Sequence, residues 1–154
     1  MPWLMKTEPE EYGLEDLKKA GVGRWDGVRN YKARNHMKAC LAGDKILIYH
    51  SGKKPQIVGV AEVARAAYPD PAQFDADSDY FDAKATPEKP RWVALDLRYV
   101  GELKSPVSLA TLKSDERFQD MEMLRQTRLS VAEVGQGHFD LVLELGQGLL
   151  ESGA

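Results

Sequence analysis

Two apolar runs constrain what this chain can fold into more than any other feature of its sequence. Lys45–His50 and Gln56–Ala64 are both rich in isoleucine and valine, residues that fit the pleated surface of a sheet. In the second run apolar side chains alternate onto both faces, which is typical of a strand covered on both sides. We therefore expect central strands over both runs, joined by a loop at Ser51–Pro55.

Weaker patterns predict the elements around these strands. A short buried strand is expected at Trp3–Met5, and period-two alternation predicts another at Trp92–Val100. Apolar spacing and capping residues predict helices over Leu14–Ala20 and Tyr31–Ala39, the second capped by Asn30. Towards the C-terminus we expect a short helix after Ser108, a helix around Gln119–Arg125, a strand at Ser130–Val134, a final helix from Phe139 to Leu145, and a frayed tail over residues 147–154.

The segment between Tyr68 and Arg91 has neither helical nor strand periodicity. It contains four prolines and five aspartates, which mark turns and loops. Loops of this length in a compact domain are usually functional or mobile. Its aromatic side chains, Phe74, Tyr80 and Phe81 among them, predict that it packs as a lid.

Length and composition narrow the class of protein. A chain of 154 residues fits one domain, and its single cysteine, Cys40, excludes an internal disulfide or thiolate zinc cluster. His36, His50 and His138 lack ligand spacing, so we expect no metal and no cofactor. No secretory signal is evident, and no apolar run approaches the roughly 20 residues that span a bilayer. We expect a soluble, cytoplasmic monomer without a membrane partner, associated with the nucleoid in a bacterium or nuclear in a eukaryote.

Charge is distributed unevenly along the chain. Between residues 24 and 54 there are eight cations and two carboxylates, whereas the whole chain carries a net charge of -3. This asymmetry predicts an anionic partner on one face. For Arg29, Lys32 and Arg34 a solvated helix face is an equally good interpretation. The predicted phosphate contacts are Arg24, Arg29, Lys32, Arg34, Lys53 and Lys54.

Trp25 and Asn30 each have two interpretations. An indole beside a glycine turn can stack on a nucleobase, but tryptophans are mostly buried in cores. Asn30 and Asp26 can read a base edge, since an amide both donates and accepts and a carboxylate accepts from an exocyclic amine. The alternative for Asn30 is the helix cap already described.

Enzyme signatures are sparse in the sequence. There is no deaminase His-x-Glu with Pro-Cys-x-x-Cys and no Gly-x-Ser-x-Gly elbow. Ser51–Lys54 resembles a phosphate loop only superficially, because the leading glycine would fall on Leu47 and position 54 is lysine. We therefore expect no catalysis.

Several ordered motifs together resemble the EVE domain family over nearly the whole chain, residues 1–146. This resemblance implies an α+β fold, a PUA-like mixed β-barrel flanked by short helices, related to YTH domains that hold a methylated adenine in an aromatic cage. It also implies binding of modified bases, notably modified cytosine in DNA, without catalysis. The motifs are Trp3–Pro9, Trp25–Tyr31, Gly43–Ser51, Val58–Val63, Tyr68–Pro71, Pro90–Val93 and Arg128–Val131.

The resemblance also implies how a base would be held. Trp25 would be a stacking wall, Lys6 and Ser51 would enter from neighbouring strands, and Leu129 and Ser130 would close the far side. The polar floor would consist of Asp26, Gly27, Val28 and Asn30.

The expected function is thus the non-catalytic binding of a modified nucleobase, in nucleic acid that is single-stranded or has the base flipped out. Two alternatives remain. One is an enzyme or sensor that binds a free nucleotide-like small molecule in the same pocket. The other is an interaction module whose basic face binds an acidic protein. A salt-dependent affinity for oligonucleotides distinguishes the binding of a base in nucleic acid from the small-molecule alternative.

Overall fold

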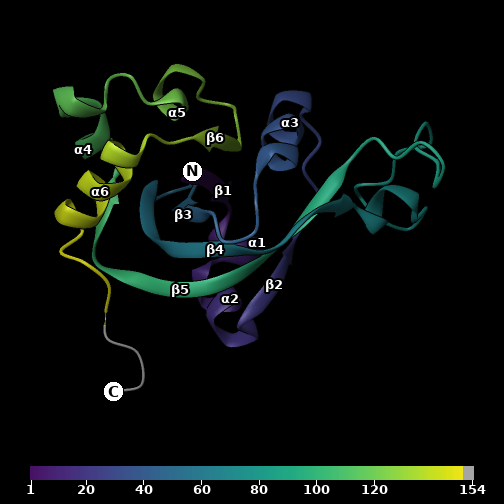
Figure 1. Cartoon of the computed structure of the whole chain (residues 1–154), viewed down its shortest axis with the longest axis horizontal. Coiled ribbons are helices and arrows are strands. Elements are labelled where there is room, and N and C mark those ends of the chain that lie inside the picture. Colours follow the sequence, from purple (N-terminus) through teal and green to yellow (C-terminus); the bar gives the residue numbers. More distant parts are fainter. Residues whose placement is uncertain (151–154) are drawn as a thin grey trace.

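A six-stranded mixed sheet forms the centre of the computed structural model, which describes residues 1–150 (Figure 1). The strand order is β2-β5-β4-β3-β1-β6. β1 runs parallel to β3, and the other neighbouring strands are antiparallel. The strands are Trp3–Thr7 (β1), Val22–Trp25 (β2), Lys45–His50 (β3), Gln56–Pro69 (β4), Val93–Ser108 (β5) and Val131–Glu133 (β6).

β4 and β5 bend the sheet into a barrel. They are 14 and 16 residues long, and their register shifts repeatedly between Ile57 and Tyr68. Such bulges bend a strand and increase its twist, and both ribbons curve around the other strands in Figure 1. Gly59 permits the close approach of β4 to β5, because a Cβ there would lie 2.5 Å from the Gly101 carbonyl oxygen. The predicted mixed barrel is confirmed.

Short helices flank the barrel, as predicted. α2 and α3 have the predicted bounds, and Gly21, with φ +77°, ends α2 by donating its N–H to the Leu17 carbonyl. None of the helices within residues 1–150 is long and apolar enough to cross a membrane. The helices are α1 (Pro9–Tyr12), α2 (Leu14–Ala20), α3 (Tyr31–Ala39), α4 (Leu109–Ser114), α5 (Glu122–Arg125) and α6 (Gln136–Leu145), with 3-10 turns at Pro71–Phe74 and Glu116–Phe118.

The two apolar runs are central strands, and β3 has the predicted bounds. Ile46, Leu47 and Ile48 are fully buried. β4 and β5 continue to Pro69 and Ser108, past the predicted ends, because the bulges let them keep pairing after their apolar alternation has stopped. β2 was not predicted: it is an edge strand with one buried residue, Trp25.

The segment between β4 and β5 is held by buried polar groups. The Gln73 side chain is fully buried. Its amide nitrogen donates to the carbonyls of Asp70 and Trp92, and its oxygen accepts from the N–H groups of Arg91 and Trp92. The amide nitrogen and the amide oxygen of Gln73 are thus both hydrogen-bonded, and these bonds hold the segment together. The segment projects beyond the ends of β4 and β5 (Figure 1).

The prediction of a frayed tail does not hold for residues 147–150. Leu149 forms a bridge with Leu103, and the N–H of Leu150 donates to the Glu102 carbonyl at 2.7 Å. The chain after α6 is therefore paired with β5. The rest of the predicted tail lies outside the described residues.

Candidate functional site

A cavity of about 540 Å³ opens where the ends of β1, β2 and β3 meet α1. We call it the central pocket. Its volume falls in the range of roughly 300–1,000 Å³ that is usual for small-ligand sites. It is lined by Lys6, Thr7, Glu8, Glu11, Tyr12, Arg24, Trp25, Asp26, Gly27, Val28, Arg29, Ser51, Tyr80, Arg128 and Ser130.

Sheet pairing explains why distant parts of the sequence meet in the central pocket. The N–H of Ser51, just after β3, donates to the Thr7 carbonyl at the end of β1 at 2.9 Å. On the other side of β1 the N–H of Lys6 donates to the Ser130 carbonyl at 2.9 Å. Of the predicted base-binding residues, the structure brings together Lys6, Trp25, Asp26, Gly27, Val28, Ser51 and Ser130.

Trp25 is mostly buried, but its indole nitrogen forms no hydrogen bond within residues 1–150. The residue is only 8 % exposed, and its ring packs edge-on against Tyr12, with the centroids 6.0 Å apart. The indole nitrogens of Trp3 and Trp92 donate to carboxylates, whereas no acceptor for that of Trp25 lies within residues 1–150. Because no unpaired polar side-chain atom is buried in this part of the chain, the indole N–H of Trp25 keeps some exposure to solvent.

Charged groups of both signs face the central pocket. Partial burial and the nearby Asp70 carboxylate raise the pKa of Asp26, although Arg24 and Arg29 oppose the shift. Burial also lowers the pKa of Lys6, whose ammonium group donates to the Thr127 carbonyl at 3.0 Å. Asp26, whose carboxylate can accept, and Trp25, whose indole can donate, both line the pocket.

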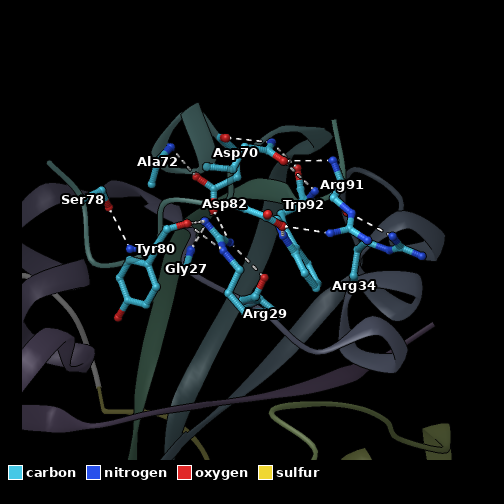
Figure 2. Close-up of polar contacts among 12 residues, drawn as sticks. Gly27, Arg29, Arg34, Asp70, Ala72, Ser78, Tyr80, Asp82, Arg91 and Trp92 are labelled. Atoms are coloured by element: carbon cyan, nitrogen blue, oxygen red, sulfur yellow. Dashed lines mark hydrogen bonds and ion pairs between the residues drawn. The ribbon is translucent and has the colours of Figure 1, made fainter. Parts of the chain in front are cut away.

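The wall at Gly27 is fixed by a set of contacts that we call the Asp70 latch (Figure 2). The fully buried Asp70 carboxylate accepts from the N–H of Gly27 and from the Arg29 guanidinium, both at 2.9 Å. Arg29 also donates twice to the Tyr80 carbonyl, at 3.0 and 2.7 Å. Gly27 has a φ of +76°, and a Cβ there would lie 3.0 Å from the Tyr80 ring. The latch thus joins the β4–β5 segment to the pocket.

The predicted phosphate contacts lie at several places in the structure. Arg29 is engaged in the latch, and Arg34 donates to the Arg91 carbonyl at 3.1 Å (Figure 2). The Arg34 guanidinium also lies over the Tyr31 ring. Lys32 pairs with Glu122 at 3.3 Å. Arg24 lines the central pocket, whereas Lys53 and Lys54 line a separate hollow of about 530 Å³ together with Glu8 and Glu10.

The EVE domain model matches residues 2–145, which is nearly the whole described chain. The chain belongs to the EVE domain family. Human thymocyte nuclear protein 1 is 35% identical over 163 residues, which cover 93% of this chain and 72% of that protein. A hypothetical protein from Leishmania major has a TM-score of 0.91 at 43% identity, covering 95% of this chain and 94% of its own.

A second solved EVE structure carries a ligand. It is human THYN1 in complex with DNA that contains 5-methylcytosine, with a TM-score of 0.91 at 34% identity, and the match covers 97% of this chain and 99% of that one. The mixed barrel described above is thus the PUA-like fold of these EVE structures.

Several residues that line the central pocket were not predicted from the sequence. Tyr12 lies in α1, which was not predicted, and Tyr80 lies in the segment that was expected to form a lid. Arg128 directly precedes Leu129 in a motif that carried the resemblance, which is the signal that could have found it. The other missed lining residues are Thr7, Glu8 and Glu11.

Two predicted base-binding residues, Asn30 and Leu129, lie outside the central pocket. Both line a neighbouring hollow of about 340 Å³, and Leu129 is 4 % exposed. The Asn30 side-chain oxygen accepts from the Ala33 N–H at 2.9 Å, which confirms the predicted cap of α3.

We expect Asn30→Ala to lower the free energy of unfolding by about 1 kcal/mol, because an orphaned N–H at the start of α3 loses its acceptor. Asn30→Asp is the matched control, since aspartate caps equally well. Urea unfolding of both variants measures the difference. Equal stability of the two would mean that the cap contributes nothing. The base-reading role of Asn30 stays a prediction.

Proposed function

We propose that this EVE domain binds DNA carrying a modified cytosine, holds that base in the central pocket, and catalyses no reaction. The main support is that human THYN1, with 34% identity and a TM-score of 0.91, forms a complex with DNA containing 5-methylcytosine. We also propose that the protein is a cytoplasmic monomer, associated with the nucleoid in a bacterium or nuclear in a eukaryote.

Hydrogen-bond complementarity at the central pocket supports cytosine as the base. Cytosine presents an exocyclic amine that donates, beside a ring nitrogen and a carbonyl that accept. The Asp26 carboxylate can accept from the amine, and the free indole N–H of Trp25 can donate to an acceptor. Thymine carries a methyl group at the same ring carbon as 5-methylcytosine but has an oxygen in place of the amine, and that oxygen would face Asp26 with no donor.

Titration with the free nucleoside 5-methyl-2′-deoxycytidine tests the pocket assignment. Each of the three tryptophans gives one indole N–H signal in an NMR spectrum. We expect the signal of Trp25 to shift, while those of Trp3 and Trp92, whose donors are already paired, stay in place. The Trp25→Phe variant assigns the signal. An unchanged Trp25 signal in the presence of a methylated oligonucleotide that binds would place the base elsewhere.

The protonation state of Asp26 gives the proposal a pH dependence. An ionised carboxylate accepts from the cytosine amine, whereas a protonated one loses this acceptor. An ordinary aspartate has a pKa of about 3.9, and the pKa of Asp26 is raised. As pH is lowered, we therefore expect affinity for the methylated strand to begin falling before the pH reaches the range in which an ordinary aspartate is protonated. Asp26→Asn should bind more weakly and remove this step from the pH profile. A wild-type profile that matches that of Asp26→Asn would exclude Asp26 as the acceptor.

A further inference from the structure

The hollow next to the central pocket is a second charged surface that the sequence did not predict. We call it the basic depression; it adjoins the central pocket through Arg128, which lines both. It is lined by Asn30, Lys32, Arg125, Gln126, Thr127, Arg128 and Leu129.

The charges of the two cavities differ. The central pocket has four cations, Arg128 among them, and three carboxylates in its lining, so its charge is nearly balanced. The basic depression has three cations, Lys32, Arg125 and Arg128, and its lining contains no carboxylate. Glu122 pairs with Lys32, but within residues 1–150 neither arginine forms an ion pair. In a chain with a net charge of -3, this unneutralised pair of guanidinium groups favours an anion.

The backbone of the same turn adds donors. Residues 126–129 form a turn closed by the N–H of Leu129, which donates to the Gln126 carbonyl at 3.1 Å. The N–H groups of Thr127 and Arg128, at its centre, have no acceptor within the described residues. The turn is fixed by the buried Leu129 and by Lys6, whose ammonium group donates to the Thr127 carbonyl at 3.0 Å.

We propose that the basic depression binds the phosphodiester backbone of the strand whose base occupies the central pocket. This inference rests on the proposed function and names the path of the strand. Guanidinium groups and backbone N–H groups are typical phosphate contacts. Arg29 and Arg34 are engaged with the protein itself, and the hollow with Lys53 and Lys54 also contains Glu8 and Glu10. The strand should therefore leave the pocket past Arg128 towards Arg125.

Salt-dependent binding of a fluorescent oligonucleotide tests the path. Each phosphate contact contributes about 0.7–0.9 to the slope of log affinity against log salt, or about five- to eightfold in affinity near 0.1 M salt. We expect Arg125→Ala to lose one such contribution, equally for methylated and unmethylated strands, and Arg125→Lys to recover part of it. Lys54→Ala, which removes the same charge from the other hollow, should change the slope little.

The path is overturned if Arg125→Ala leaves the slope unchanged, or if Lys54→Ala lowers affinity and slope as much. Arg125 is exposed, so its loss should change stability by no more than about 0.5 kcal/mol, which a melting curve checks. Arg125→Gln replaces the alanine variant if that one melts early. The wild-type ratio of affinities for methylated and unmethylated strands tests the proposed function separately, because it does not depend on Arg125.

Discussion

Asp70→Ala is expected to lower the free energy of unfolding by about 3 kcal/mol or more, the range measured when one partner of a buried ion pair is removed. Asp70 is fully buried and accepts from Gly27, Arg29 and Ala72. Without it, a partly buried guanidinium loses its counter-charge and the Gly27 N–H loses its acceptor. Urea unfolding followed by circular dichroism measures the loss.

Two further variants show whether the Asp70 latch is the cause. Asp79→Ala removes an exposed carboxylate from the same segment and should change stability by no more than about 0.5 kcal/mol. Asp70→Asn keeps the shape but not the charge, and should lie between the two. Because the latch holds Gly27 and Tyr80 at the pocket, both Asp70 variants should also bind the methylated strand more weakly. A cost below about 1 kcal/mol for Asp70→Ala would refute the latch.

Trp25→Ala is expected to affect both stability and binding. Removing a buried tryptophan costs roughly 3–5 kcal/mol of stability. Loss of the predicted stacking between its ring and a base costs about 1–3 kcal/mol of affinity. Trp25→Phe separates the two, because it keeps an aromatic ring and removes the indole N–H. One lost hydrogen bond of about 0.5–1.5 kcal/mol predicts roughly a two- to thirteenfold weaker affinity for this variant.

Trp3→Phe is the matched control for Trp25→Phe. Trp3 is also buried, and its indole N–H donates to Asp44, outside the central pocket. This control should lose stability and keep its affinity for the methylated strand. If Trp25→Phe binds as tightly as the wild type with its fold intact, the indole N–H has no role in binding.

Local chemistry explains which parts of the fold could be predicted from the sequence. Strand β3 follows from a dense apolar run, and helices α2 and α3 from caps within a few residues of their ends. β2 was missed because one buried side chain, Trp25, gives no periodic signal and its pairing partner β5 is distant in sequence. The paired residues 147–150 were missed for the same reason, since their partners lie around Leu103.

The sequence predicted which residues lie at the candidate site better than it predicted the contacts of each. Lys6, Ser51 and Ser130 were placed by family resemblance, because no spacing rule brings three strand ends together. The partner of Arg29 could not be predicted, since the sequence does not show that Asp70, 41 positions away, is in contact with it; its phosphate contact stays a prediction. Arg125 was missed because its neighbours across the basic depression are set by the tertiary fold.

Recognition of a modified cytosine is tested by wild-type affinities for three single-stranded oligonucleotides, which carry 5-methylcytosine, cytosine or thymine at one position and are otherwise identical. We predict the tightest binding for 5-methylcytosine. Thymine, which has the methyl group without the amine, should be weaker by about 1–3 kcal/mol, the cost of one wrong base contact. Cytosine or thymine bound as tightly as 5-methylcytosine would contradict recognition of a modified cytosine in the central pocket.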